Sequence, residues 1–554
     1  MYKFNTGQYT AIECFAKPTG PSGHLKLTDP QGRESFRFTD HPYYNWIKIP
    51  LHKNTDYYAE LDNIQVSVAY LSGGEDLLER GICYIEFAEC TRVLEGKELS
   101  KHYDSPIREQ YHFSPIKNWV NDPNGLCWFK GYYHLFFQAN PHEQKWDIMY
   151  WGHAVSRDLI HWTHMPYVLE PQRELFYKDG SPRTGGAFSG CAVPLKDQVN
   201  FYLTRHEGEL GNKFTREYQT MAVSRDMVRL ENETVVLSDK PRGVLQDFRD
   251  PKVTKIDGSW YMVLGCCKDG KPSVLLYRSE DLLHWDYVND LVTEREADAA
   301  TLECPDFFQL DGKYIAMAGL MGYTDLHGRF QMTKYYVGQF ENEKFKAEQT
   351  GWLDFGGNFY AAQSFAHDGK RFLIGWISDF YNEHIYRENG AYGSFGLPRI
   401  LKVKENKLFM EPVPQVYGLI DKVLYRGCAE KVSVKAIEGN TYYAKITFRA
   451  DTDFKITLVK DEERYIGLEK RGRSTEIVTY GAERSNIHFV ADVTEVKFLE
   501  IFVDRRLTEV FINHGEAVGS KIFYTEKHDG EFEFAAEQED ALEEIEVAHM
   551  GSIW

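Results

Sequence analysis

Long apolar runs are missing from this sequence, and so are the marks of export. No run reaches the roughly 18 apolar residues of a membrane-spanning helix. The first ten residues, MYKFNTGQYT, do not place an apolar segment after a basic one, as a secretory signal would. We therefore expect a cytoplasmic protein that does not associate with membranes.

Cysteine is scarce and irregularly placed. The nine cysteines form no CxxC pair, so neither a disulfide framework nor a zinc site is indicated. No loop with closely spaced Asp and Asn residues predicts a calcium site either. We expect reduced thiols, no bound metal and no cofactor.

Basic residues are outnumbered. The 64 Lys and Arg against 83 Asp and Glu give a net charge of −19, which disfavours nucleic acid and anionic membranes as partners. A neutral ligand is favoured instead. Aromatic residues, by contrast, make up 15% of the chain, and their rings suit both β-sheet packing and stacking on sugar faces.

The two ends of the chain alternate between apolar and polar residues. At 554 residues the chain exceeds the roughly 100–200 residues of a typical domain. In residues 1–105 the alternation includes Leu25 and Leu27 before a DPQG turn, and predicts a small β-sandwich-like N-terminal domain of unknown role. Residues 412–554 contain IFVDRRLTEVFINHGEAV, two strands joined by a tight turn, and predict a linker followed by a C-terminal β-sandwich.

A turn followed by an aromatic or apolar strand recurs five times between residues 106 and 411: KGYYHLFF, DQVNFYLT, DGSWYMVLG, DGKYIAMAG and DGKRFLIGW. The turns lie near positions 131, 198, 258, 312 and 369, and each interval holds one four-stranded blade with its loops. The segments SRDLIHW, SRDMVRL and SEDLLHW follow the first three turns as a second repeat. We predict an all-β chain whose middle domain is a five-bladed β-propeller.

Acidic residues occupy matching positions in these repeats. Eight or nine residues before each turn stand Asp122, Ser189, Asp250, Glu303 and Tyr360. Because the first strand of every propeller blade lines the central axis, we predict that the three carboxylates share one pocket. Like charges held that close destabilise a fold, so the cluster indicates a function.

Glycoside cleavage needs such a set. One acid protonates the departing oxygen, while a carboxylate attacks or stabilises the anomeric carbon. The segment NDPNG predicts an amide-rich turn at Asp122, which suits the ionised role, whereas Glu303 has the longer arm for proton delivery. Two neighbouring negative charges would favour the protonated donor.

Several ordered motifs support this chemistry by resemblance. YHFSPIKNWVNDPNG, YYHLFFQANP, WGHAVSRDLIHW, FSGCAV, FRDPKV, LECPDFF and FYAAQSF occur in this order, and DRRLTEVFINHGEAV follows. From about residue 108 to the end the chain resembles glycoside hydrolase family 32, the β-fructofuranosidases, which include invertases, exo-inulinases, levanases and sucrose-6-phosphate hydrolases.

The resemblance implies a retaining double displacement on a terminal β-fructofuranosyl unit of a small carbohydrate. Asp122 would be the nucleophile, Asp250 would hold fructose hydroxyls and stabilise the transition state, and Glu303 would be the general acid and then the base. The implied fructose pocket contains Trp119, Asn121, Gln138, Trp146, Phe188, Ser189, Arg249 and Trp376. Tyr360 joins it by its place in the fifth repeat.

Two positions depart from the family pattern. Asn358 stands where the family more often has Asp, and Tyr150 stands where His is frequent. Because of these departures, the resemblance leaves the substrate preference beyond the first sugar open. The first 105 residues lie outside the usual family architecture, and could bind fructan, shield one edge of the propeller or mediate assembly.

Several alternatives remain open at this stage. An inverting pentosidase on a similar propeller would space its acids further apart, and a non-catalytic sugar-binding propeller would not need them. A fructosyltransferase would share the covalent intermediate. Sucrose, sucrose 6-phosphate, fructo-oligosaccharides, inulin and levan are all candidate substrates, and the oligomeric state is not indicated.

Overall fold

The structure is a computed structural model that describes residues 1–40, 42–88, 90–173, 175, 183–209, 215–381, 390–481, 487–525 and 529–554. These residues form mostly β-strands, β1 to β43, with the short α-helices α1 (Leu77–Arg80) and α2 (Lys97–Tyr103). Within those ranges no helix is long and apolar enough to cross a membrane. The mostly β class predicted from the sequence is confirmed.

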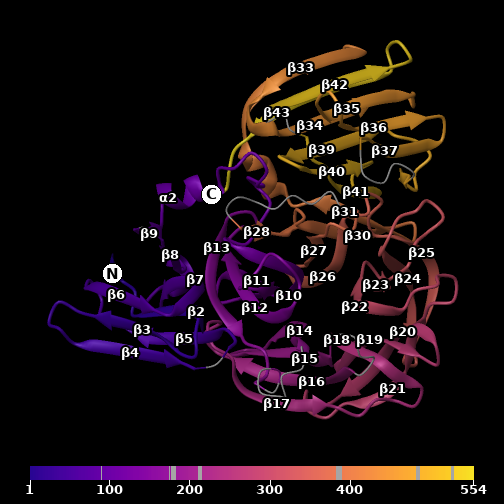
Figure 1. Cartoon of the computed structure of the whole chain (residues 1–554). Helices are drawn as coiled ribbons and strands as arrows, with labels where there is room; N and C mark the ends of the chain where they lie inside the picture. Colours follow the sequence, from indigo (N-terminus) through magenta and orange to yellow (C-terminus); the bar gives the residue numbers. More distant parts are fainter. Residues whose placement is uncertain are drawn as a thin grey trace.

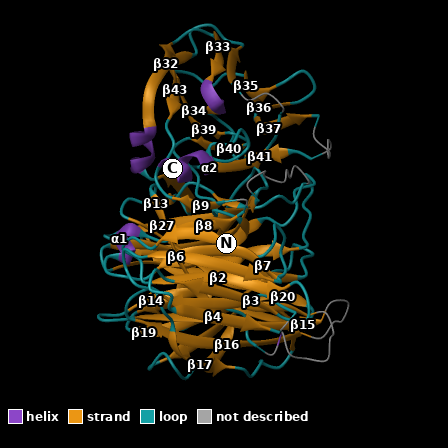
Figure 2. Cartoon of the chain, turned by 60° about the vertical axis from the view of Figure 1, so that its left-hand side comes forward, coloured by secondary structure: helices purple, strands orange, loops and turns teal. Residues whose placement is uncertain are grey.

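The N-terminal strands form two sheets that share a core. The first is ordered β1 (Tyr2–Asn5), β6 (Asp56–Asp62), β3 (Gly23–Thr28), β4 (Glu34–Thr39), and the second is ordered β5 (Asn45–Pro50), β2 (Ala11–Pro18), β7 (Ile64–Ser72), β8 (Cys83–Phe87), β9 (Thr91–Leu94). Leu25 and Leu27 of the first sheet and Ile12 and Cys14 of the second belong to one buried cluster. Figure 1 shows these indigo strands beside the middle region, and Figure 2 shows them from another side.

The middle of the chain contains five hairpins whose turns fall at the predicted positions. They are β10 (Asn118–Phe129) with β11 (Tyr132–Asn140), β14 (Arg183–Pro194) with β15 (Val199–Glu209), β18 (Val244–Ile256) with β19 (Ser259–Lys268), β22 (Thr301–Leu310) with β23 (Lys313–Met321), and β26 (Phe359–His367) with β27 (Lys370–Ile377). Two further strands extend each hairpin into a four-stranded unit. In chain order these pairs are β12 (Ile148–Ser156) and β13 (Trp162–Leu169), β16 (Thr215–Ser224) and β17 (Glu231–Leu237), β20 (Lys271–Ser279) and β21 (Asp286–Thr293), β24 (Thr333–Glu341) and β25 (Lys344–Trp352), and β30 (Arg399–Lys404) and β31 (Lys407–Pro412). Figure 1 shows the first strands, β10, β14, β18, β22 and β26, gathered toward the middle of this region.

The repeated SRD and SED segments close the turn after the third strand. In the first of them the Ser156 hydroxyl accepts a hydrogen bond from the Leu159 amide at 2.8 Å, and in the second the Ser224 hydroxyl accepts one from Met227 at 2.9 Å. The following apolar residue is left-handed each time, with φ of 72° at Leu159 and 65° at Met227. The repeat therefore has a structural role, since its serine satisfies the backbone of a tight turn.

Each of the five first strands contains a β-bulge, and the bulges correct the predicted equivalence of the site positions. Asp122 and Ser189 are the second unpaired residue of their bulge, and Asp250 is the first. Glu303 and Tyr360 are instead each the last paired residue before the bulge of their own strand. The offset arises because β10 has a second bulge nearer its turn, and because four residues connect Pro194 to Val199 after β14 where two residues form the turns of the later hairpins. A bulge re-aims side chains, so positions that are not equivalent can still face one cavity.

The C-terminal strands form two six-stranded sheets around their own core. Their orders are β32 (Ile420–Gly427), β43 (Leu542–Met550), β34 (Thr441–Phe448), β39 (Phe498–Asp504), β40 (Leu507–Ile512), β41 (Ala517–Ile522), and β33 (Lys431–Ile437), β42 (Gly530–Ala536), β35 (Phe454–Lys460), β36 (Tyr465–Arg471), β37 (Ser474–Tyr480), β38 (Phe489–Val490). Figure 1 shows them above the middle region. Buried ionic contacts join the two parts: His112 lies 2.8 Å from Asp504 and 3.0 Å from Glu509, and Arg399 lies 2.6 Å from Glu509.

Candidate active site

One cavity of about 570 Å³ collects the residues singled out from the sequence. Asp122 of β10, Asp250 of β18 and Glu303 of β22 all line it. The other predicted residues in its wall are Trp119, Asn121, Gln138, Trp146, Phe188, Arg249, Tyr360 and Trp376. Ser189 lies behind this wall, where its hydroxyl donates to Asp122 at 2.5 Å.

Donors from several strands orient the Asp122 carboxylate. Besides Ser189, the Asn121 amide donates to Oδ1 at 3.1 Å, and the Cys304 thiol lies 3.3 Å from Oδ2. The indole N–H of Trp119 in turn donates to the Asn121 side-chain oxygen at 2.7 Å, which fixes the direction of that amide. The rotation of Asp122 is therefore restricted before any ligand arrives.

Glu303 is held by a cation and a phenol. The Arg249 guanidinium lies 3.0 Å from Oε1, and the Tyr360 hydroxyl donates to Oε2 at 2.8 Å. Burial and the neighbouring Glu303 raise the pKa of Tyr360 well above its usual range, so Tyr360 remains a donor at any physiological pH. Glu303 therefore has a positive neighbour, Arg249, as well as the negative neighbours expected from the sequence.

Among the three carboxyls of the site, Asp250 has a clearly raised pKa. Its side chain is buried, and burial, together with the charges of Glu303 and Asp122, raises its pKa from 3.8 to about 7 despite the opposing effect of Arg249. The Cys304 backbone N–H donates to Asp250 Oδ2 at 2.8 Å. Asp250 has a left-handed φ of 65°, a conformation that Asp tolerates better than most residues.

Cys304 connects the three carboxylates, and sequence reasoning missed it. It is bonded to Glu303, contacts Asp122 through sulfur and contacts Asp250 through its amide. Its φ of 47° matches that of Asp250 at the same bulge position. Its place directly after Glu303 in LECPDFF was the available signal.

A buried Glu217 on β16 anchors Arg249 from behind. Its carboxylate lies 3.0 Å from Arg249 and 2.9 Å from His206. Burial would raise the pKa of Glu217, but Arg249 and His206 lower it to about 2, so it stays ionised. No motif in the sequence indicated Glu217, since its partner lies 32 residues away on the next sheet.

Further residues complete the wall. The Phe188 ring stacks on the His206 ring at 4.1 Å, and Trp146, at 42% exposure, approaches Phe188 from the rim. The unpredicted residues of the cavity are His206, Asp247, Cys304, Met321, Gln331 and Phe380. The indole N–H of Trp376 is buried and has no hydrogen-bond partner among the described residues.

The two departures from the family pattern lie outside the lining of this cavity. Tyr150 is buried edge-on against Phe15 of the N-terminal region. Asn358 is buried where its side-chain oxygen accepts from Lys521 at 3.0 Å, in the C-terminal part of the chain. Both therefore join parts of the molecule rather than lining the pocket.

Three carboxylates in one cavity suit glycoside cleavage, a reaction in which two carboxyl groups act on the scissile bond. Residues 112–412 match the model of the glycosyl hydrolases family 32 N-terminal domain, and residues 427–549 match that of the family 32 C-terminal domain. The chain therefore belongs to glycoside hydrolase family 32 and is an enzyme of the β-fructofuranosidase type.

Individual relatives agree with the family models. A sucrose-6-phosphate hydrolase from Zymomonas mobilis is 34% identical over 445 residues, which cover 74% of this chain and 84% of that protein. A glycoside hydrolase family 32 structure from Bifidobacterium adolescentis has a TM-score of 0.92 at 30% identity, and the match covers 100% of this chain and 99% of that one. A β-fructofuranosidase structure from Bombyx mori has a TM-score of 0.70 at 28% identity, covering 82% of this chain and 97% of that one. The region before residue 106 is thus shared with at least one solved family member.

Proposed function

We propose that this enzyme hydrolyses terminal β-D-fructofuranosyl units from sucrose or short fructo-oligosaccharides with retention of configuration. The observation that supports this most directly is the convergence of Asp122, Asp250 and Glu303, which come from three separate hairpins, on one cavity of a family 32 chain. The relatives include a sucrose-6-phosphate hydrolase and a levanase, and sucrose is bound in a Bombyx mori β-fructofuranosidase variant.

In the proposed first step, the Asp122 carboxylate attacks C2 of the fructosyl unit. The bond between C2 and the glycosidic oxygen breaks, and Glu303 gives its proton to that departing oxygen. In the second step, water attacks C2, Glu303 takes a proton from that water, and the bond to Asp122 breaks. Fructose is released and both carboxyls return to their starting states.

The surrounding residues have positioning roles in this proposal. Asp250 accepts hydrogen bonds from fructose hydroxyls, and the unpartnered Trp376 N–H donates to another hydroxyl. Arg249 and Tyr360 hold Glu303 over the glycosidic oxygen. Trp119, Asn121, Gln138, Trp146, Phe188 and Ser189 shape the fructose pocket.

We further propose the domain layout that positions this site. Residues 106–411 form a five-bladed β-propeller with one blade on each hairpin, the first two blades being joined in one sheet by the pairing of β12 with β14, and residues 412–554 form a linker and a β-sandwich. Residues 1–105 form a sandwich-like N-terminal domain. The nine free cysteines among the described residues suit the reducing cytoplasm, where we place the enzyme.

Product analysis tests the reaction. The protein is incubated with sucrose, sucrose 6-phosphate, 1-kestose, inulin and levan, and the anomeric form of the released sugar is followed by NMR. Asp122→Ala and Glu303→Ala should each lower turnover by at least about 10²-fold. Glu296→Gln, whose side chain is 85% exposed and lies outside the cavity, serves as control. Wild-type rates in either alanine variant, or release of the inverted anomer, would overturn the proposal.

A further inference from the structure

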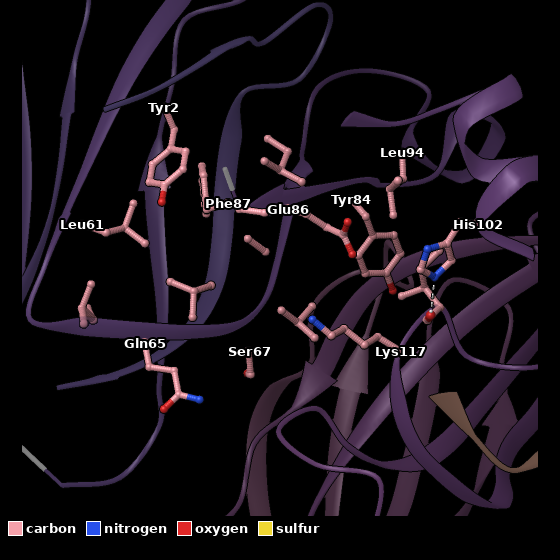
Figure 3. Close-up of a pocket in the computed structure, with 17 residues that line it drawn as sticks. Tyr2, Leu61, Gln65, Ser67, Tyr84, Glu86, Phe87, Leu94, His102 and Lys117 are labelled. Atoms are coloured by element: carbon pink, nitrogen blue, oxygen red, sulfur yellow. Dashed lines mark hydrogen bonds between the residues drawn. The ribbon is translucent and has the colours of Figure 1, made fainter. Parts of the chain in front are cut away.

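A second cavity, of about 510 Å³, lies in the N-terminal region, away from the three carboxylates (Figure 3). Its walls come from β7 and β8, with contributions from β1, β6, β9, α2 and the segment just before β10. Its volume falls within the range of ligand sites, roughly 300–1,000 Å³. Nothing in the proposed reaction uses it.

The cavity exists because two neighbouring strands part. β7 and β8 pair only at Tyr70 with Tyr84 and at Leu71 with Cys83. Beyond that point β7 pairs only with β2, and β8 pairs only with β9, so two strand edges without a strand partner among the described residues face each other. Backbone N–H and C=O groups on such edges need water or a ligand as partners.

The side chains around this wedge combine aromatic and polar surfaces. Tyr2 and Phe87 form one wall, with ring centroids 5.3 Å apart. Gln65 and Lys117 also line the cavity, and Figure 3 shows the Lys117 amine extending into it from the side opposite Tyr2. Lys117 has no ion-pair partner among the described residues. Glu86, the one acidic residue of the wall, is already paired with Arg92 at 3.0 Å.

We infer that this cavity binds a neutral di- or trisaccharide. Sugar hydroxyls both donate and accept, and so match the alternating backbone groups of the free strand edges, while Tyr2 and Phe87 offer apolar faces to the sugar rings. A strongly charged ligand would find a single unpaired cation, Lys117. An extended peptide fits less well, because the strands converge at Tyr70 and Tyr84 and close the wedge at that end.

Crystals and calorimetry of the full chain test the inference. Glu303→Gln is used as background so that sugar is not consumed, and sucrose and 1-kestose are the probes, a choice that rests on the proposed function. We expect two bound sugars, one in each cavity. Gln65→Ala and Tyr84→Phe should each weaken the second site roughly 3- to 10-fold and leave wild-type sucrose turnover unchanged.

Matched controls separate a local from a general effect. Gln31→Ala and Tyr58→Phe change the same residue types at exposed positions outside the cavity, and should leave both affinities unchanged. Sugar bound only among the three carboxylates, or unchanged affinity in Gln65→Ala and Tyr84→Phe, would overturn the inference. Sugar in the second cavity of a protein that hydrolyses none of the substrates would uphold it and defeat the proposed function instead.

Discussion

Replacing Asp250 by Asn should stabilise the fold at neutral and alkaline pH while removing most activity. Asp250 is 4% exposed, and burial with two nearby carboxylates raises its pKa from 3.8 to about 7. For an acid, a raised folded-state pKa means that the ionised form is disfavoured in the native state. The wild-type protein therefore loses stability as the pH rises from about 4 to about 7, and the Asn variant does not.

The size of the effect follows from those two pKa values. With 3.8 in the unfolded chain and about 7 in the fold, linkage predicts a penalty of about 0.6 kcal/mol at pH 4 and about 4 kcal/mol at pH 8. The difference in unfolding free energy between variant and wild type should grow by roughly 3 to 4 kcal/mol over this range. Asp250→Asn also alters the hydrogen bond from the Cys304 backbone N–H, which changes the stability difference by the same amount at every pH and leaves its growth with pH unaffected.

Thermal or urea unfolding of both proteins between pH 4 and pH 8 measures this growth. Asp281→Asn is the matched control, because the backbone N–H and ring of His284 lower the pKa of Asp281. Its stabilising contribution is therefore already present above the unfolded-state value of 3.8, and its replacement should cost stability by an amount that does not grow between pH 4 and pH 6. A stability difference for Asp250→Asn that stays flat across the range would refute the reasoning.

Three further predictions concern the neighbourhood of the site. Glu217→Gln frees Arg249 and should lower kcat/KM about 10- to 100-fold in a sucrose assay, whereas an unchanged value would contradict the anchoring role. Burial lowers the pKa of His112, but Asp504 and Glu509 outweigh it and raise that pKa from 6.5 to about 9. The charged imidazole therefore stabilises the fold below pH 6.5, and this stabilisation is lost as the pH rises through 9. In urea unfolding, His112→Gln should lower the unfolding free energy by about 3 kcal/mol at pH 6 and by much less at pH 10. Tyr150→His should leave the ratio of sucrose to 1-kestose turnover unchanged, and a changed ratio would mean that this position affects the preference beyond the first sugar.

Much of the architecture was predictable because it depends on local chemistry. The Gly-containing turns near 131, 258, 312 and 369 need residues that accept a left-handed backbone, and these stand in the sequence where the hairpins turn. The all-β class followed from alternation and repeats. The convergence of Asp122, Asp250 and Glu303 followed from the repeat, although its exact register did not.

The missed features depend on contacts between distant residues. Glu217 on β16 contacts Arg249 on β18, a strand of the neighbouring sheet. The arginine charge comes to lie beside Glu303 only when β18 and β22 pack together. The bulges shift Asp250 and Glu303 by one and two positions relative to Asp122, which a count from the turns could not detect. Tyr150 and Asn358 likewise acquired their roles from packing partners in other parts of the chain.

The sequence by itself determined where the strands turn, which acids recur in the repeats and to which family the motifs point, because these depend on residue type and spacing along the chain. The tertiary structure alone decided how the carboxylates are charged and oriented, and where the N-terminal strands part to leave a second cavity. Electrostatic energies and unpaired strand edges depend on distances in space, and those are set only when the sheets pack together.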